Sequence, residues 1–127
     1  MDFSHSEVRE ERLALVAETV AKYPVAGFEL QLNYSPHYFH PAEAAAGCAI
    51  MTEWVAECHA VVKASGTGRI LIIRVPCSLE GCLARGLDVA AWLERGIVDL
   101  LVTQVCTVSR HAQRPSLICS QPADHAK

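Results

Sequence analysis

The sequence contains no apolar stretch long enough to cross a membrane. Its longest apolar runs, residues 70–73 and 97–102, have the length of strands, and Asp99 interrupts the second. A transmembrane helix needs about 20 apolar residues. Residues 1–12 are polar and charged, and they lack the apolar core of a secretory signal peptide. We therefore expect a soluble, cytoplasmic chain with no membrane partner.

An excess of positive charge is also absent. The chain has 11 Lys and Arg against 14 Asp and Glu, which gives a net charge of −3. Proteins that bind nucleic acid or anionic membranes non-specifically depend on clustered cationic side chains. The charge balance therefore gives no reason to expect a nucleic-acid partner.

The six cysteines include no CxxC pair. Cys48 and Cys58 fall on the apolar stripe of a predicted helix, and Cys77 and Cys82 flank a short loop, so we expect free and mostly buried thiols. A zinc site built from Cys77, Cys82, Cys106 and a histidine is the alternative, although these spacings match no common zinc pattern. A redox role would require thiols that titrate freely in the native protein. We expect no metal and no other cofactor.

The sequence does have ample apolar residues for one packed domain, at 51% of 127 residues. Hydrophobic periodicity, proline and glycine predict helix, strand, helix, strand, helix and strand in that order. The predicted elements are residues 6–23, 26–34, 41–64, 69–76, 87–95 and 97–104, with Ser6 as the first N-cap.

The helix over residues 41–64 has the clearest pattern. Apolar residues recur at steps of three and four along one stripe, Pro41 suits the first helical position, and a Ser-Gly-Thr-Gly segment ends the helix. The stripe consists of Ala44, Cys48, Met51, Val55, Cys58 and Val62.

Helical crossovers between successive strands require a parallel sheet. We therefore predict an α/β domain over residues 1–104, with three parallel strands that alternate with helices in an open sheet. Residues 105–127 have no sustained period. For these residues we expect an irregular, mobile tail with one short strand at residues 116–119.

The candidate site begins in the first predicted strand. Apolar residues at 28, 30 and 32 alternate with Glu29, Gln31 and Asn33, so one strand face is polar. A loop with aromatic and histidine residues follows. In parallel α/β proteins, ligands bind at the carboxyl ends of the strands. The loop residues in question are Tyr34, His37, Tyr38 and His40.

Each of these side chains also has a structural interpretation. Glu29 acts on a substrate or joins an internal polar network with Arg74 of the next strand, which itself recognises substrate or forms a salt bridge. Gln31 and Asn33 bind sugar hydroxyls or fill space.

The loop residues carry similar alternatives. Tyr34 and Tyr38 stack on sugar rings or cover the end of the sheet. His37 and His40 have a spacing that metal sites use, but no further ligand is evident, and His40 is placed to cap the following helix.

Several segments match a known family in order and spacing. DFSHSEVRE, AGFELQLNYSPHYFHP, RILIIRVPCSLEGC and GLDVAAWLERGIVDLLV resemble the middle of a glycoside-hydrolase-like (β/α)8 barrel over residues 2–104. The resemblance implies that residues 27–34 form a central strand, near the fourth of eight, which leads to a sugar-binding face. It also implies that residues 69–76 and 97–104 form the next two strands.

Two departures from that family limit what the resemblance implies. Gln31 stands where many relatives carry an aspartate, and an amide cannot replace a carboxylate that attacks an anomeric carbon. A closed barrel needs eight strands and about 200 residues or more. We therefore expect a barrel fragment that lacks an intact catalytic pair, with carbohydrate as its ligand and with self-association through open sheet edges. The alternative is a non-catalytic α/β binding or scaffolding module that works as an oligomer.

Overall fold

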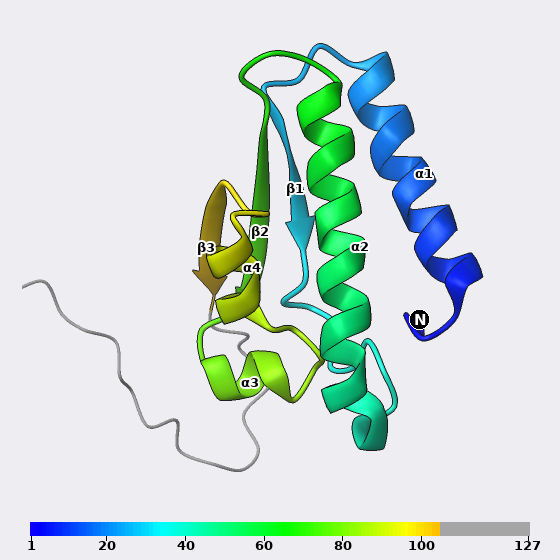
Figure 1. The fold of residues 1–127 in the computed structure, drawn as a ribbon, viewed down its shortest axis with the longest axis vertical. Coiled ribbons are helices and arrows are strands. Elements are labelled where there is room, and N and C mark those ends of the chain that lie inside the picture. Colours follow the sequence, from blue (N-terminus) through cyan, green and yellow to red (C-terminus); the bar gives the residue numbers. More distant parts are fainter. Residues whose placement is uncertain (105–127) are drawn as a thin grey trace, which may run out of the picture.

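The computed structural model describes residues 1–104 and has the predicted order of elements (Figure 1). The elements are α1 (Ser6–Lys22), β1 (Gly27–Gln31), the 3-10 turn η1 (Pro41–Glu43), α2 (Ala44–Ala64), β2 (Ile70–Pro76), α3 (Leu79–Leu83), α4 (Val89–Arg95) and β3 (Leu100–Gln104). The expected irregular tail, the strand at residues 116–119 and Cys106 lie outside the described residues.

The three strands form one parallel sheet in the order β1-β2-β3. Glu29 lies opposite Ile72, and Gln31 lies opposite Arg74, which in turn lies opposite Val102. The prediction of an α/β protein with an open, parallel, three-stranded sheet is confirmed.

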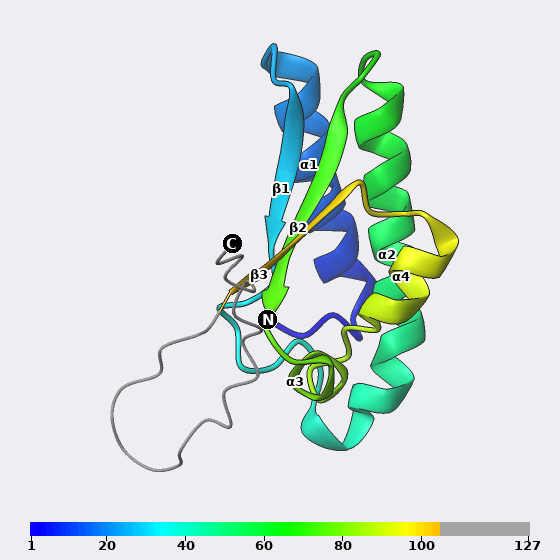
Figure 2. The same ribbon diagram turned by 90° about the vertical axis from the view of Figure 1, so that its left-hand side faces the viewer.

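Helices α1, α2 and α4 all lie on the same side of this sheet (Figure 2). Because side chains alternate along a strand, every second residue of β2 points into the helices. The side chains of Leu71, Ile73 and Val75 are accordingly buried, together with the predicted stripe of α2. The fully buried members of that stripe are Met51, Val55, Cys58 and Val62, whereas Cys48 is only half-buried.

Some predicted boundaries were wrong by a few residues. His5, not Ser6, is the N-cap of α1, and its side chain makes no capping hydrogen bond. Strand β3 begins at Leu100 and not at residue 97 as predicted, because Gly96 and Ile97 complete the end of α4. The backbone N–H of Ile97 donates to the Trp92 carbonyl at the end of α4, next to Gly96 in the left-handed conformation (φ 65°).

The loop between β1 and α2 is anchored by the buried ring of Phe39. A Cβ atom added to Gly47 would lie 2.5 Å from this ring, and one added to Gly86 would lie 2.6 Å from it. A glycine of α2 and a glycine of the connection between α3 and α4 therefore make room for Phe39. This packing holds the loop against the start of α2 and against that connection.

No helix among the described residues is long and apolar enough to span a membrane.

We predict that Thr52→Val destabilises the fold. The indole Nε1 of Trp92 on α4 donates a 3.0 Å hydrogen bond to the hydroxyl of Thr52 on α2, and both side chains are buried. Valine removes the acceptor, so the free energy of unfolding should fall by about 1–3 kcal/mol in urea denaturation. Thr52→Ser should retain most of the stability. The matched control is Thr19→Val on α1, whose hydroxyl donates to the Leu15 carbonyl at an exposed position. An equal loss in both valine variants would contradict the prediction.

Candidate functional site

The polar face of β1 is tied to β2 by an ion pair. Arg74 Nε donates a 2.6 Å hydrogen bond to Glu29 Oε1, and the Gln31 amide lies 3.5 Å from the same oxygen. The hydrogen bond from Arg74 holds the pKa of Glu29 below its usual value. The expected salt bridge is present, and it keeps the Glu29 carboxyl ionised.

A second part of this polar cluster lies at the carboxyl ends of the strands. The Asn33 side chain is 2% exposed, and its amide donates to Gln104 Oε1 at 3.2 Å. Arg74 Nη1 donates to the same oxygen at 3.3 Å. Gln104 was missed from the sequence, although its place at the end of a strand parallel to that of Arg74 was a usable signal.

Of the predicted loop residues, Tyr34 and Tyr38 line one cavity together with Gln31 of β1, whereas His37 and His40 do not line it. Tyr34 is 66% exposed and His37 is exposed, whereas Tyr38 is buried. His40 Nδ1 accepts a 3.3 Å hydrogen bond from the Ala42 backbone N–H and so caps η1, as the sequence indicated. Within residues 1–104, no three His, Cys, Asp or Glu side chains gather as they would around a metal ion.

The thiols are held in apolar surroundings. Burial raises the pKa of Cys58 to about 12 and also raises the pKa of Cys48 and Cys82. Cys77 is exposed. Buried thiols with raised pKa values are poor nucleophiles and poor metal ligands.

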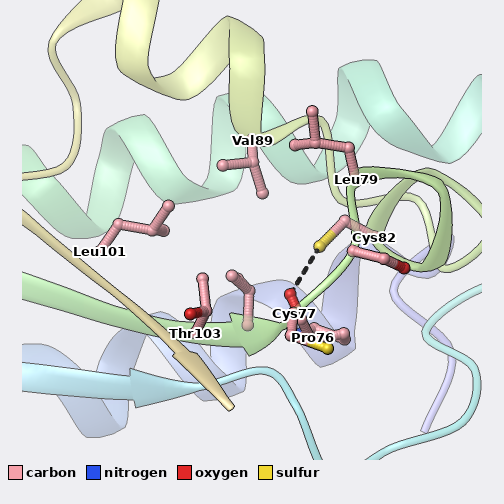
Figure 3. Close-up of a pocket in the computed structure, with 9 residues that line it drawn as sticks. Pro76, Cys77, Leu79, Cys82, Val89, Leu101 and Thr103 are labelled. Atoms are coloured by element: carbon pink, nitrogen blue, oxygen red, sulfur yellow. Dashed lines mark hydrogen bonds between the residues drawn. The ribbon is translucent and has the colours of Figure 1, made fainter. Parts of the chain in front are cut away.

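A cavity of about 200 Å³ lies where β2 and β3 meet α3 and α4 (Figure 3). Its walls include Val75, Val89 and Leu101, and the Cys82 thiol donates to the Pro76 carbonyl at 3.4 Å. The lining holds no carboxylate, histidine or cation. The cavity can therefore accept a small apolar group, and its polar lining side chains are those of Cys77, Ser78, Cys82 and Thr103.

Asp99 has a structural role, in agreement with the prediction from the sequence, because its carboxylate binds groups of neighbouring elements. One carboxylate oxygen accepts from the Leu71 backbone N–H at 2.8 Å, and the other lies 2.8 Å from Lys63 Nζ. Burial raises the pKa of Asp99, but the hydrogen bonds from Lys63 and Leu71 outweigh it and lower the pKa overall. This carboxylate links α2, β2 and the start of β3.

Few carboxylates are left for catalysis. Asp88 Oδ1 accepts from the Ala91 backbone N–H and caps α4, and Glu80 lies on α3. Among the described strand residues, Glu29 is the single carboxylate on the face that the helices leave open. A glycosidase needs two carboxyl groups about 5–10 Å apart.

Neither a scan against models of known protein families nor a search of curated proteins gives a match for this sequence.

We predict that Asp99→Asn lowers stability in a pH-dependent manner. Because the pKa of Asp99 is below its ordinary value of 3.8 in the folded state, the unfolded state binds the proton more tightly. The stabilisation is therefore complete above about pH 5 and is lost as the pH falls through 3.8 toward the folded-state pKa.

Urea denaturation of both proteins between neutral and acidic pH checks this. At neutral pH we expect Asp99→Asn to be less stable by about 1 kcal/mol, because the ion pair is partly solvated. The difference should shrink in acid. Glu94→Gln, at an exposed position of α4, serves as a control with little effect. A loss in Asp99→Asn that does not change with pH would contradict the assignment.

Proposed function

We propose that this chain is a non-catalytic α/β module that works as an oligomer. Copies of the chain associate through the sheet face opposite the helices, which we call the uncovered face. Its described side chains are those of Glu29, Gln31, Ile70, Ile72, Arg74, Leu100, Val102 and Gln104.

The apolar side chains of the uncovered face carry this proposal. Ile70, Ile72 and Val102 are half-buried within the single chain, and Leu100 is 49% exposed. Parallel sheets occur almost only with both faces covered, since their strands are apolar on both sides. No described helix covers this face (Figure 2). Burial against another molecule is therefore favourable.

The edges of the sheet favour association as well. Within the described residues, β1 and β3 each pair with β2 alone, so each leaves one row of backbone N–H and C=O groups unpaired. Open edges of this kind pair readily with other strands.

A second copy suits the charges of the uncovered face. Glu29 and Arg74 lie side by side on adjacent strands. A two-fold axis across the face would place each carboxylate near the partner's guanidinium, so that the same patch is complementary to itself. The ion pair of Glu29 and Arg74 would then be enclosed by the apolar side chains of both copies instead of facing solvent.

The finer architectural proposal is that the sheet corresponds to part of a (β/α)8 barrel. The support is the repeated helix–strand order, the parallel register and the polar residues at the carboxyl ends of the strands. In such a barrel the uncovered face would line the interior. Glycoside hydrolysis is less well supported, because Glu29 is engaged by Arg74 and Gln31 is an amide.

We predict that the protein forms a discrete oligomer that a charge on the uncovered face dissociates. Ile72→Glu places an unpaired carboxylate at the centre of this face, and the dissociation constant should rise at least about tenfold, or about 1.4 kcal/mol. Sedimentation velocity over a concentration series measures the change, and circular dichroism verifies that the variant folds.

The matched control is Leu93→Glu, on α4 at a position that is 54% exposed. It should sediment as the wild type does. A wild-type chain that stays monomeric, or an oligomer unaffected by Ile72→Glu, would contradict the proposal. A polydisperse aggregate would instead support the interpretation as a barrel fragment.

We also predict that the isolated protein does not hydrolyse glycosides. Release of nitrophenol from a panel of nitrophenyl glycosides should equal the rate without protein, both for the wild type and for Glu29→Gln. Hydrolysis by the wild type that disappears in Glu29→Gln would show that Glu29 is catalytic and would overturn the proposal.

A further inference from the structure

A cavity of about 290 Å³ lies beside the open edge of β1. Three sections of chain line it: the N-terminal segment, β1 with the loop that follows, and the sides of α1 and α2 that face them. Its strand contribution includes the helix-side residues Leu30 and Leu32, and it meets the uncovered face only at Gln31, at the edge of the sheet. The polar cluster of Glu29 and Arg74 does not line it.

The floor of the cavity is aromatic and fixed. The Phe3 ring meets the Trp54 ring edge-on at a centroid distance of 5.0 Å and the Tyr38 ring at 5.7 Å, and all three side chains are buried. The Phe3 backbone N–H donates to the Tyr38 carbonyl at 2.8 Å. Trp54 Nε1 donates to the Arg9 carbonyl at 3.0 Å. These contacts preform an apolar wall on which a flat group can lie.

Arg12 supplies the one cationic side chain of the lining. Its Nε is shielded from solvent and has no acceptor, and no hydrogen bond or ion pair joins Arg12 to another residue among 1–104. Each other arginine of residues 1–104 donates at least one hydrogen bond: Arg9, Arg69, Arg74, Arg85 and Arg95.

An unpaired guanidinium at a protein cavity favours an anion. A carboxylate pairs with the planar donor face of arginine through parallel, charge-assisted hydrogen bonds. The positive charge of Arg12 therefore favours a ligand with an anionic group. The aromatic wall favours a ligand whose remaining part is a flat apolar ring.

We infer that this cavity binds a small aryl carboxylate, with the ring on the wall of Phe3, Tyr38 and Trp54 and the carboxylate on Arg12. A sugar fits less well, since Gln31, Tyr34, Ser35 and Tyr38 are the other polar side chains of the lining and they do not surround the cavity with free partners. The Ser35 hydroxyl already donates to the His37 carbonyl at 2.7 Å, so several sugar hydroxyls would be left unmatched. The volume is at the lower end for ligand pockets, about 300 Å³, which limits the ligand to one or two rings.

The test uses phenylacetate as the probe, with the neutral phenylacetamide as its charge-free counterpart. Titrations are followed through the Trp54 indole resonance and the Phe3 and Gln31 amide resonances in ¹H–¹⁵N spectra. Phenylacetate should shift these signals with saturation. Phenylacetamide should bind at least about tenfold more weakly, which corresponds to about 1.4 kcal/mol.

Arg12→Gln should weaken phenylacetate binding by a similar factor and remove the preference over the amide. Arg12→Lys should retain part of that preference, because it keeps the charge and loses the planar fork. The control is Arg95→Gln, which removes an exposed arginine that pairs with Glu53, and it should bind as the wild type does. Equal binding to Arg12→Gln, or shifts that map away from the cavity, would overturn the inference.

The same titration on Ile72→Glu separates this inference from the proposed oligomer. Binding by both the wild type and Ile72→Glu supports the site whatever the oligomeric state is. Absence of binding in both overturns the site and leaves the oligomer proposal intact. Binding by Ile72→Glu alone would mean that a second copy fills the cavity, and it would overturn the inference for the assembled protein.

Discussion

The packing of one helical layer against a parallel sheet is the constraint on which the other features depend. Parallel strands are apolar on both sides, and residues 1–104 supply helices for one side only. The side of β2 that faces α2 buries Leu71, Ile73 and Val75 completely or nearly so, whereas Ile72 and Leu100 remain accessible on the other side. The covered face stabilises the chain, and the uncovered face is the surface through which we propose that copies of the chain associate.

The same constraint shapes the chemistry at the carboxyl ends of the strands. A charged residue on a strand needs a partner when its surroundings are apolar. Arg74 and Glu29 satisfy each other at 2.6 Å, and Gln104 accepts from both Arg74 and Asn33. The Glu29, Arg74 and Gln104 side chains are thus engaged within the protein, whereas the buried Asn33 Oδ1 has no hydrogen-bond partner among residues 1–104. Among residues 1–104, the guanidinium without a hydrogen bond or ion pair is that of Arg12, which borders an aromatic cavity at the edge of β1. Binding is therefore better supported there than catalysis is on the polar face.

Periodic patterns in the sequence predicted most of the fold. The stripe of α2 follows from spacings of three and four, which are a local property. The parallel order, and with it the Glu29–Arg74 contact between adjacent strands, follows from the helical crossovers. What the sequence did not give were features that depend on contacts between distant residues. Gln104 meets Asn33 across 71 positions, and Arg12 borders the loop after β1 only because α1 lies against it. The boundary of β3 was missed because Ile97 completes the end of α4.

Methyl-resolved NMR at increasing protein concentration tests most directly whether the uncovered face is the surface of association. We expect the methyl signals of Ile70, Ile72, Leu100 and Val102 to shift or broaden as the concentration rises. Those of Leu71 and Ile73, which face the helices, should stay constant. Uncovered-face signals that are independent of concentration, or shifts confined to the outer surfaces of the helices, would contradict it.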